Sequence, residues 1–141
     1  QVHEVLALAA AADGGELDDP FGDPVADQAN WRAHNPWDLA ERLSGTKLVI
    51  HTRDGRPGPF DPPTQPFDTG ESLTHEMSVS FHERLLSLGI AHTWADLGPG
   101  SHRWAYWRRD LSEVMPSLMR TFRKARRAAA KAKRRRARAP R

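Results

Sequence analysis

The most regular hydrophobic pattern in the chain lies between residues 71 and 88, where apolar side chains recur every three or four positions. This spacing predicts an amphipathic helix, and Gly89 directly after it suits a left-handed C-cap. Two short apolar runs flank the helix, KLVIHT at 47–52 and IAHTWADL at 90–97, and we interpret both as buried strands. The helix positions are Leu73, Met77, Phe81, Leu85 and Leu88.

Two further helices are expected. One begins at Asn35-Pro36, because Asn is a good N-cap and Pro fits the first helical position. The other runs from about Trp104 to Phe122, and residues 2–12 form either a short helix or a buried strand. The alternation of helices and strands predicts an α/β fold with parallel strands. The apolar side of the first of these helices consists of Trp37, Leu39, Ala40 and Leu43.

Two visible strands are too few to cover a parallel sheet on both faces. Either the N-terminal region supplies more strands or the chain is part of a larger sheet, and we favour the second explanation. Long loops rich in Gly, Pro and Asp occupy 13–30 and 53–70, and the second of them holds five prolines. We therefore expect a partial domain over 1–122, in which the loop 53–70 is a candidate functional segment, followed by a basic segment at 123–141.

Charge divides the chain sharply. No Asp or Glu follows Glu113, whereas 120–141 holds twelve Lys and Arg. In residues 1–119, nine Lys and Arg face all eighteen Asp and Glu, a formal charge of −9. We expect the tail to be either a frayed helical extension or, as we favour, a disordered and solvated terminus. The alternative function for the chain is a non-catalytic remnant whose tail binds nucleic acid or an anionic membrane or cell-wall surface.

Several classes of function are disfavoured by composition. The chain has no cysteine, so it has no disulfide and no thiol nucleophile. No apolar run approaches the roughly 20 residues of a transmembrane helix, and the start of the chain lacks the basic region of a signal peptide. We expect no metal and no cofactor, because His75 and Glu76 open an H-E-x-x-H pattern in which Val79 replaces the second His. The first residue is Gln rather than Met, which favours a processed or truncated product.

Glu71 and His102 are the candidates for chemistry. Glu71 opens the helix after the first strand, and His102 follows the second strand in a glycine-rich turn. Functional groups gather at the carboxyl ends of parallel strands, so these two side chains are expected to lie close together. A carboxylate that accepts from one imidazole nitrogen leaves the other nitrogen to take a proton from a hydroxyl nucleophile. Alternatively, Glu71 is a favourable first-turn acid and His102 an ordinary turn residue.

Three stretches, HNPWDLAERL…TKLVIHTRDG, ESLTHEMSVSFHERL and GPGSHRWAYWRRDL, resemble the C-terminal half of an actinobacterial esterase family related to the antigen 85 mycolyltransferases. The resemblance implies an α/β-hydrolase fold, hydrolysis or transfer of small-molecule or lipid acyl esters, and a secreted or cell-envelope location. It implies that His102, in G-[ST]-H-x-W-x-Y-W, is the catalytic base and that Glu71, before Leu73 and Thr74, is the catalytic acid.

The chain departs from that family in one large respect. It contains no G-x-S-x-G nucleophile elbow, and the first part of the sheet and the oxyanion-hole loop are also missing. We therefore interpret it as the C-terminal portion of an α/β-hydrolase fold that lacks the N-terminal nucleophile half, and expect little or no ester hydrolysis from it alone. Ser101 is unsuited as a nucleophile because it directly precedes His102 in the same turn. Trp37, Trp104 and Trp107 are expected to wall the substrate pocket.

Overall fold

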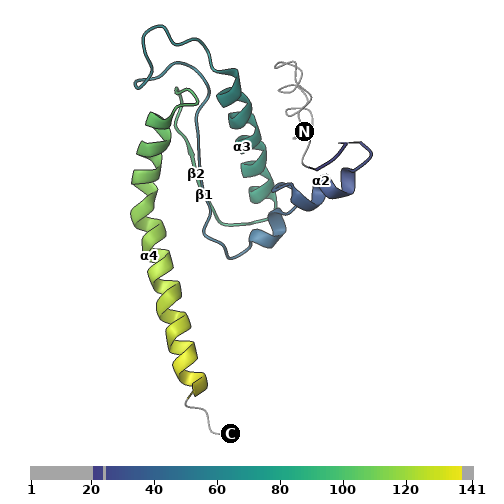
Figure 1. Ribbon diagram of the computed structural model, residues 1–141, viewed down its shortest axis with the longest axis vertical. Helices are drawn as coiled ribbons and strands as arrows, with labels where there is room; N and C mark the ends of the chain where they lie inside the picture. The colour runs from purple at the N-terminus through teal and green to yellow at the C-terminus, as the bar shows by residue number, and fades with distance from the viewer. Residues whose placement is uncertain (1–20, 24, 138–141) are drawn as a thin grey trace. The chain divides into compact units, whose positions relative to one another are not determined.

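The structure is a computed structural model that describes residues 21–23 and 25–137. The element expected at 2–12 and the loop residues 13–20 lie outside the described residues. The chain divides into two compact units, Gln1–Arg103 and Trp104–Arg141. The first holds helix α2 (Gln28–His34), a 3₁₀ turn (Ala40–Leu43), strand β1 (Val49–Thr52), helix α3 (Thr69–Ser87) and strand β2 (Thr93–Asp96), and the second is the single helix α4 (Trp104–Ala137) (Figure 1).

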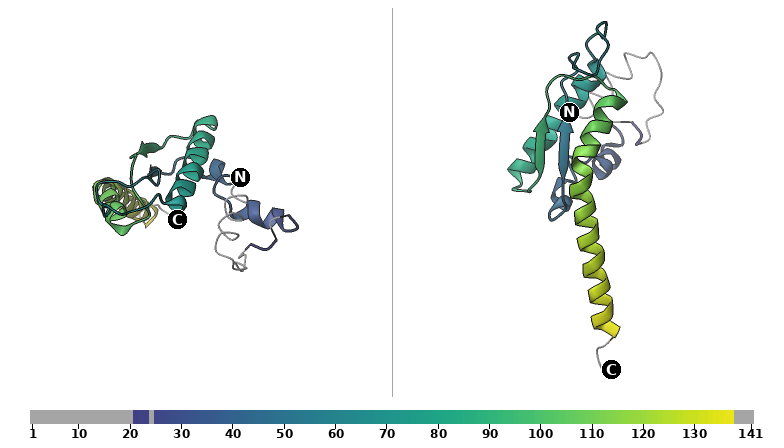
Figure 2. Two further views of the ribbon diagram at one scale, coloured as in Figure 1. Left: turned by 90° about the horizontal axis from the view of Figure 1, so that it is seen from above. Right: turned by 90° about the vertical axis from the view of Figure 1, so that its left-hand side faces the viewer.

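β1 and β2 form a parallel pair in which Val49 lies opposite Thr93 and Thr52 opposite Asp96. α3 packs beside β1, and both views in Figure 2 show this helix alongside the strands. The small core between them is built on Leu85 and Ile90, with Ile50 of β1 packed against it. The expected α/β class with parallel strands is confirmed, and both strands are shorter than the apolar runs that predicted them. Their expected burial is wrong: only Thr52 of β1 is buried and both ends of β2 are exposed, because each is an edge strand of a two-stranded sheet. Because both strands end at the same edge, the segments that follow them meet there.

The helix expected to begin at Asn35-Pro36 is wrong. Asn35 is instead the C-cap of α2, and its backbone N–H donates to Trp31 O. Its side chain also closes the next turn, because Oδ1 accepts from the Trp37 N–H at 3.1 Å and Nδ2 donates to Asp38 at 2.7 Å. An Asn whose side chain bonds nearby backbone favours a turn as readily as a helix start. Regular structure resumes only in the 3₁₀ turn from Ala40 to Leu43. α2 also occupies the last three residues of the expected loop 13–30.

The disorder favoured for the basic tail is not what the structure shows, because α4 continues through it to Ala137. Ala, Arg and Lys have the highest helix propensities, and residues 123–137 contain almost nothing else. The helical extension is therefore the better of the two expectations. Within the described part of the chain, no helix combines the length and the apolar character needed to cross a membrane.

Candidate active site

The central contact of the site joins the turn after β2 to the first turn of α3. His102 Nδ1 lies 2.8 Å from Glu71 Oε2. The Glu71 side chain is 7% exposed, whereas the His102 ring is 53% exposed. An ionised carboxylate only accepts hydrogen bonds, so this contact places a proton on Nδ1 and the lone pair on Nε2. The structure thus brings together the two residues that the sequence predicts as a pair, with the acid buried and the imidazole open to solvent.

Asp68 fixes both members of this pair. One of its carboxylate oxygens accepts from the Glu71 N–H at 3.0 Å, which makes Asp68 the N-cap of α3, and the other accepts from the His102 N–H at 2.8 Å. Burial acts to raise the pKa of Asp68, but the hydrogen bonds from Glu71 and His102 outweigh it and hold the pKa below its ordinary value. Sequence reasoning missed Asp68. The D-x-x-E spacing of a capping box was the signal that would have found it.

The side chain of Glu71 departs from the usual capping arrangement. In a capping box, the acid at this helical position turns back to the N-cap N–H. Here the Asp68 N–H donates to Gly55 O at 2.8 Å instead, and the Glu71 carboxylate points to His102. A first-turn acid that served only the helix dipole would need neither this partner nor this burial. The contact therefore favours the acid–base interpretation of Glu71 over the purely structural one.

The backbone around Gly55 brings the three segments of the site together. The Gly55 N–H donates to Gly100 O at 3.1 Å, and the Gly100 N–H donates to Arg56 O at 2.7 Å. Gly55 has a φ of +80°, and a Cβ there would lie 2.3 Å from Asp68 O and 3.0 Å from Ser72 N. Only a glycine lets the loop after β1 pass this close to the start of α3.

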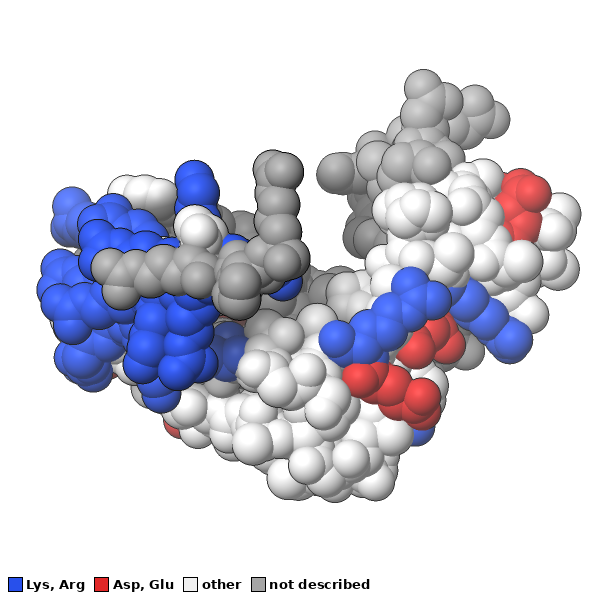
Figure 3. Space-filling view, turned by 90° about the horizontal axis from the view of Figure 1, so that it is seen from below, with Lys and Arg blue, Asp and Glu red and all other residues white. Residues whose placement is uncertain are grey.

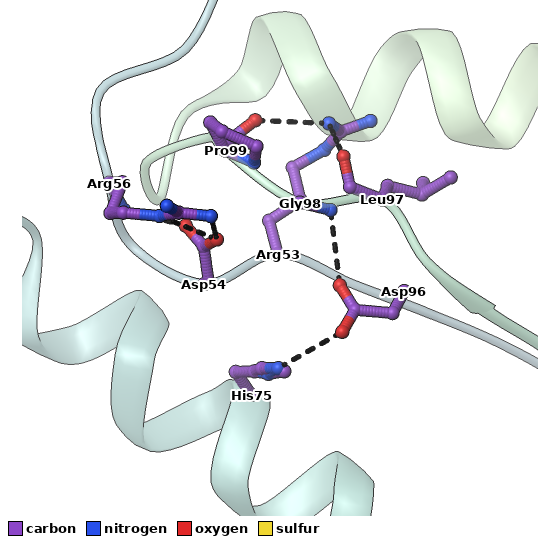
Figure 4. Close-up of polar contacts among 8 residues, drawn as sticks. All are labelled: Arg53, Asp54, Arg56, His75, Asp96, Leu97, Gly98 and Pro99. Atoms are coloured by element: carbon purple, nitrogen blue, oxygen red, sulfur yellow. Dashed lines mark hydrogen bonds and ion pairs between the residues drawn. The ribbon is translucent and has the colours of Figure 1, made fainter.

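Arg53 holds the turn that leads to His102. Its buried guanidinium reaches from the end of β1 to the carbonyl oxygens of Leu97 at 3.4 Å and Pro99 at 3.3 Å (Figure 4). Nearby, hydrogen bonds from Arg56 hold the pKa of Asp54 below its ordinary value. Sequence analysis missed the role of Arg53, because its partners are backbone atoms more than forty residues away.

The Ser101 hydroxyl is hydrogen-bonded to the long loop after β1. This fully buried hydroxyl donates to Asp61 Oδ1 at 2.5 Å, and the other oxygen of Asp61 accepts from the Gly58 N–H. The hydroxyl therefore ties the turn to the long loop after β1. The contact adds Asp61 as a positioning residue that the sequence analysis missed, and the exclusion of Ser101 as the nucleophile stays a prediction.

The three tryptophans expected at the pocket lie in different places. Trp37 lines a groove of about 710 Å³ along α3 with Ile50, His75 and Phe81, and Glu71 and His102 are not among the lining residues. The Arg84 guanidinium lies 4.6 Å from the centre of the Trp37 ring. Trp104 and Trp107 are exposed neighbours in α4 whose ring centres are 5.9 Å apart. Their part in substrate binding stays a prediction.

Three further histidines, His75, His82 and His92, contact neighbouring side chains. His82 Nδ1 lies 2.6 Å from His92 Nε2, and the His82 ring stacks on Trp94 at 4.4 Å. His75 Nε2 lies 3.4 Å from Asp96 (Figure 4). In residues 21–23 and 25–137, no three His, Asp or Glu side chains are grouped so that they could hold a metal ion.

Comparison with known proteins finds a distant relative of this chain. The chain is similar to diacylglycerol acyltransferase/mycolyltransferase Ag85B of Mycolicibacterium smegmatis, with 25% identity over 114 residues. The match covers 79% of this chain and 35% of that relative, so the chain spans about a third of the relative's length. No family model matches the chain, and no solved structure matches it. The similarity supports a distant relationship to an acyltransferase of the antigen 85 type.

Proposed function

We propose that this chain carries the acid–base pair of a serine-type carboxylic-ester hydrolase or acyltransferase with an α/β-hydrolase fold. The observation that supports the proposal is the 2.8 Å contact between the buried Glu71 carboxylate and the half-exposed His102 imidazole. Both residues follow parallel strands that are neighbours in the sheet, where such folds place functional groups. The distant similarity to an acyltransferase points to the same chemistry.

In this mechanism, Glu71 holds the Nδ1–H tautomer of His102, and Nε2 acts as the general base. Nε2 takes the proton of a serine hydroxyl as the serine oxygen attacks the ester carbonyl. The imidazolium, steadied by Glu71, then donates that proton to the departing alkoxide, which leaves as an alcohol. An incoming water or alcohol loses its proton to Nε2 and attacks the acyl-enzyme, and proton return to the serine completes the cycle.

The serine of this mechanism is proposed to come from polypeptide outside these 141 residues, which contain no G-x-S-x-G. Trp37 is proposed to contribute to the binding site for the acyl chain of a small-molecule or lipid ester, and a part of Trp104 and Trp107 in substrate binding stays a prediction. Large aromatic side chains supply apolar area of the kind that an acyl chain requires.

The proposal is tested in the polypeptide that joins this chain to the coding region upstream of Gln1. We expect an in-frame G-x-S-x-G there and turnover of a p-nitrophenyl ester. His102→Gln should lower kcat on the order of 10⁶-fold, and Glu71→Gln about 10⁴-fold, as in other catalytic triads. In the 141-residue chain itself, NMR should show a His102 Nδ1–H signal that Glu71→Gln removes.

Matched controls separate the site from general effects of substitution. His34→Gln removes an exposed imidazole from α2, and Glu76→Gln removes an exposed carboxylate from α3. Turnover of His102→Gln within about tenfold of the His34→Gln value would contradict the proposal, since the loss of a general base costs at least about 100-fold.

A further inference from the structure

α4 exposes a continuous apolar stripe along its first half. Residues 104, 107, 111, 115, 119 and 122 recur at intervals of three and four, so they share one side of the helix. All six side chains are between 38% and 64% exposed. They are Trp104, Trp107, Leu111, Met115, Met119 and Phe122. Contiguous exposed apolar surface of this kind marks a contact surface.

The second half of the same helix is densely basic. Ten Lys and Arg lie between Arg120 and Arg136, every residue of this segment is exposed, and it contains no Asp or Glu. Figure 3 shows a dense group of Lys and Arg side chains. Four of these cations, Arg120, Arg123, Lys124 and Arg127, line one shallow hollow at helical intervals of three, one and three. On a helical projection these four cations are centred about 120° around the helix from Met119 and Phe122, so the cationic and apolar positions lie on adjoining sides of this part of α4.

We propose that α4 docks on an anionic lipid surface, with its apolar stripe in the acyl–headgroup boundary and its cations among the headgroups. A helix that combines a strong Lys/Arg face with Trp, Phe and Leu on the other side lies in the plane of a membrane interface. The stripe ends at Phe122 and the basic segment begins at Arg120, so the two overlap at 120–122 and adjoin along one helix. The charge complementarity is strong, because a whole half-helix is cationic with no acid to offset it.

A nucleic-acid partner explains less of the helix. Phosphate contacts use cations and need no apolar stripe, whereas interfacial docking uses both. The Trp pair at the start of the stripe adds to this argument, because Trp is enriched at the level of lipid headgroups. A lipid surface is therefore the partner that accounts for both the apolar stripe and the basic segment of α4.

Vesicle binding of the full 141-residue chain tests the proposal, with phosphatidylcholine vesicles that either contain or lack phosphatidylglycerol. We expect binding only to the anionic vesicles, weakened by high salt. Arg123→Gln with Arg127→Gln should lower the partition coefficient about tenfold or more. Met119→Gln with Phe122→Gln should also lower it about tenfold or more, without reducing binding to duplex DNA.

Two double variants serve as matched controls: Arg32→Gln with Arg42→Gln for charge, and Phe67→Gln with Leu86→Gln for exposed apolar side chains. Both controls should bind vesicles like the unmodified chain. The proposal is wrong if Met119→Gln with Phe122→Gln leaves vesicle binding unchanged while Arg123→Gln with Arg127→Gln weakens binding to both vesicles and DNA. In that case the tail binds polyanions in general. If the apolar variant instead only dissociates an oligomer, the stripe is a contact between copies, which also overturns the proposal.

Discussion

Gly55→Ala tests whether the loop after β1 is locked against the start of α3. The alanine Cβ would lie 2.3 Å from Asp68 O and 3.0 Å from Ser72 N, both of them backbone atoms. Backbone atoms in a helix N-terminus cannot turn aside as a flexible side chain can, so either the loop or the helix must shift by about 1 Å to restore ordinary van der Waals contact. Such a shift acts directly on Asp68, which holds both Glu71 and His102.

The chain supplies its own control for the size of this effect. Gly45 has a φ of +79°, almost equal to the +80° of Gly55, and a Cβ there would meet nothing within 4 Å. Gly45→Ala should therefore lower the free energy of unfolding by only about 1 to 2 kcal/mol, the penalty for placing alanine in the left-handed backbone conformation. Gly55→Ala should cost the same amount plus about 1 to 3 kcal/mol for overpacking. The difference between the two variants isolates the close approach at Gly55.

Urea unfolding followed by tryptophan fluorescence measures both free energies of unfolding by linear extrapolation. We expect Gly55→Ala to lie below Gly45→Ala by at least about 1 kcal/mol, with loss of the His102 Nδ1–H signal in NMR. Equal free energies within about 0.5 kcal/mol would refute the reasoning, because the contact with Asp68 and Ser72 would then have no energetic consequence.

Two further predictions concern the partners of the pair. Asp68→Asn should lower the free energy of unfolding at neutral pH by about 1 to 2 kcal/mol relative to Glu76→Gln, because the amide keeps only one acceptor oxygen for two N–H donors. Urea unfolding measures the difference. The pKa of Asp68 is lowered in the folded chain, so the stability from its charged form is present above its ordinary pKa of 3.8 and is lost as pH falls through the lowered value. A cost of Asp68→Asn that does not begin to shrink as pH falls below 3.8 would contradict this. Ser101→Ala should cost about 1 kcal/mol of stability and leave acyl-enzyme formation in the complete polypeptide unaltered, and loss of the acyl-enzyme burst would identify Ser101 as the nucleophile after all.

The hydrophobic pattern predicted the parts of the fold in which a buried stripe is long or strongly β-branched. α3 and β1 were found in this way, since Leu85 and Ile50 belong to the same small core. The second apolar run also led to β2, although its core residue, Ile90, precedes the strand. The 35–43 segment failed because Asn35 has two strong local roles, as an N-cap or as a turn residue, and propensity alone does not choose between them. The tail failed in the other direction, because high helix propensity outweighed the like charges that favoured disorder.

Only the part of the candidate site that follows from strand topology was predictable from the sequence. Because functional groups lie at the carboxyl ends of parallel strands, Glu71 and His102 were predicted to be close although 31 residues separate them. Strand topology could not identify Arg53, whose guanidinium binds carbonyl oxygens, or Asp61, whose partner is the buried Ser101 hydroxyl. Backbone partners have no sequence signature, and a single aspartate in a loop of many polar residues has none either.

The contacts that build the Glu71–His102 pair all lie between the end of β1 and the turn after β2. Asp68 caps α3 and holds the His102 N–H, Gly55 joins the loop to both segments, and Arg53 anchors the turn. None of these contacts involves the exposed side chains of α4 or the groove beside Trp37. The geometry of the acid–base pair is therefore set by a continuous segment of about fifty residues. The supply of a nucleophile is a separate requirement for the proposed function, because the contact between Glu71 and His102 forms within this chain, which contains no G-x-S-x-G.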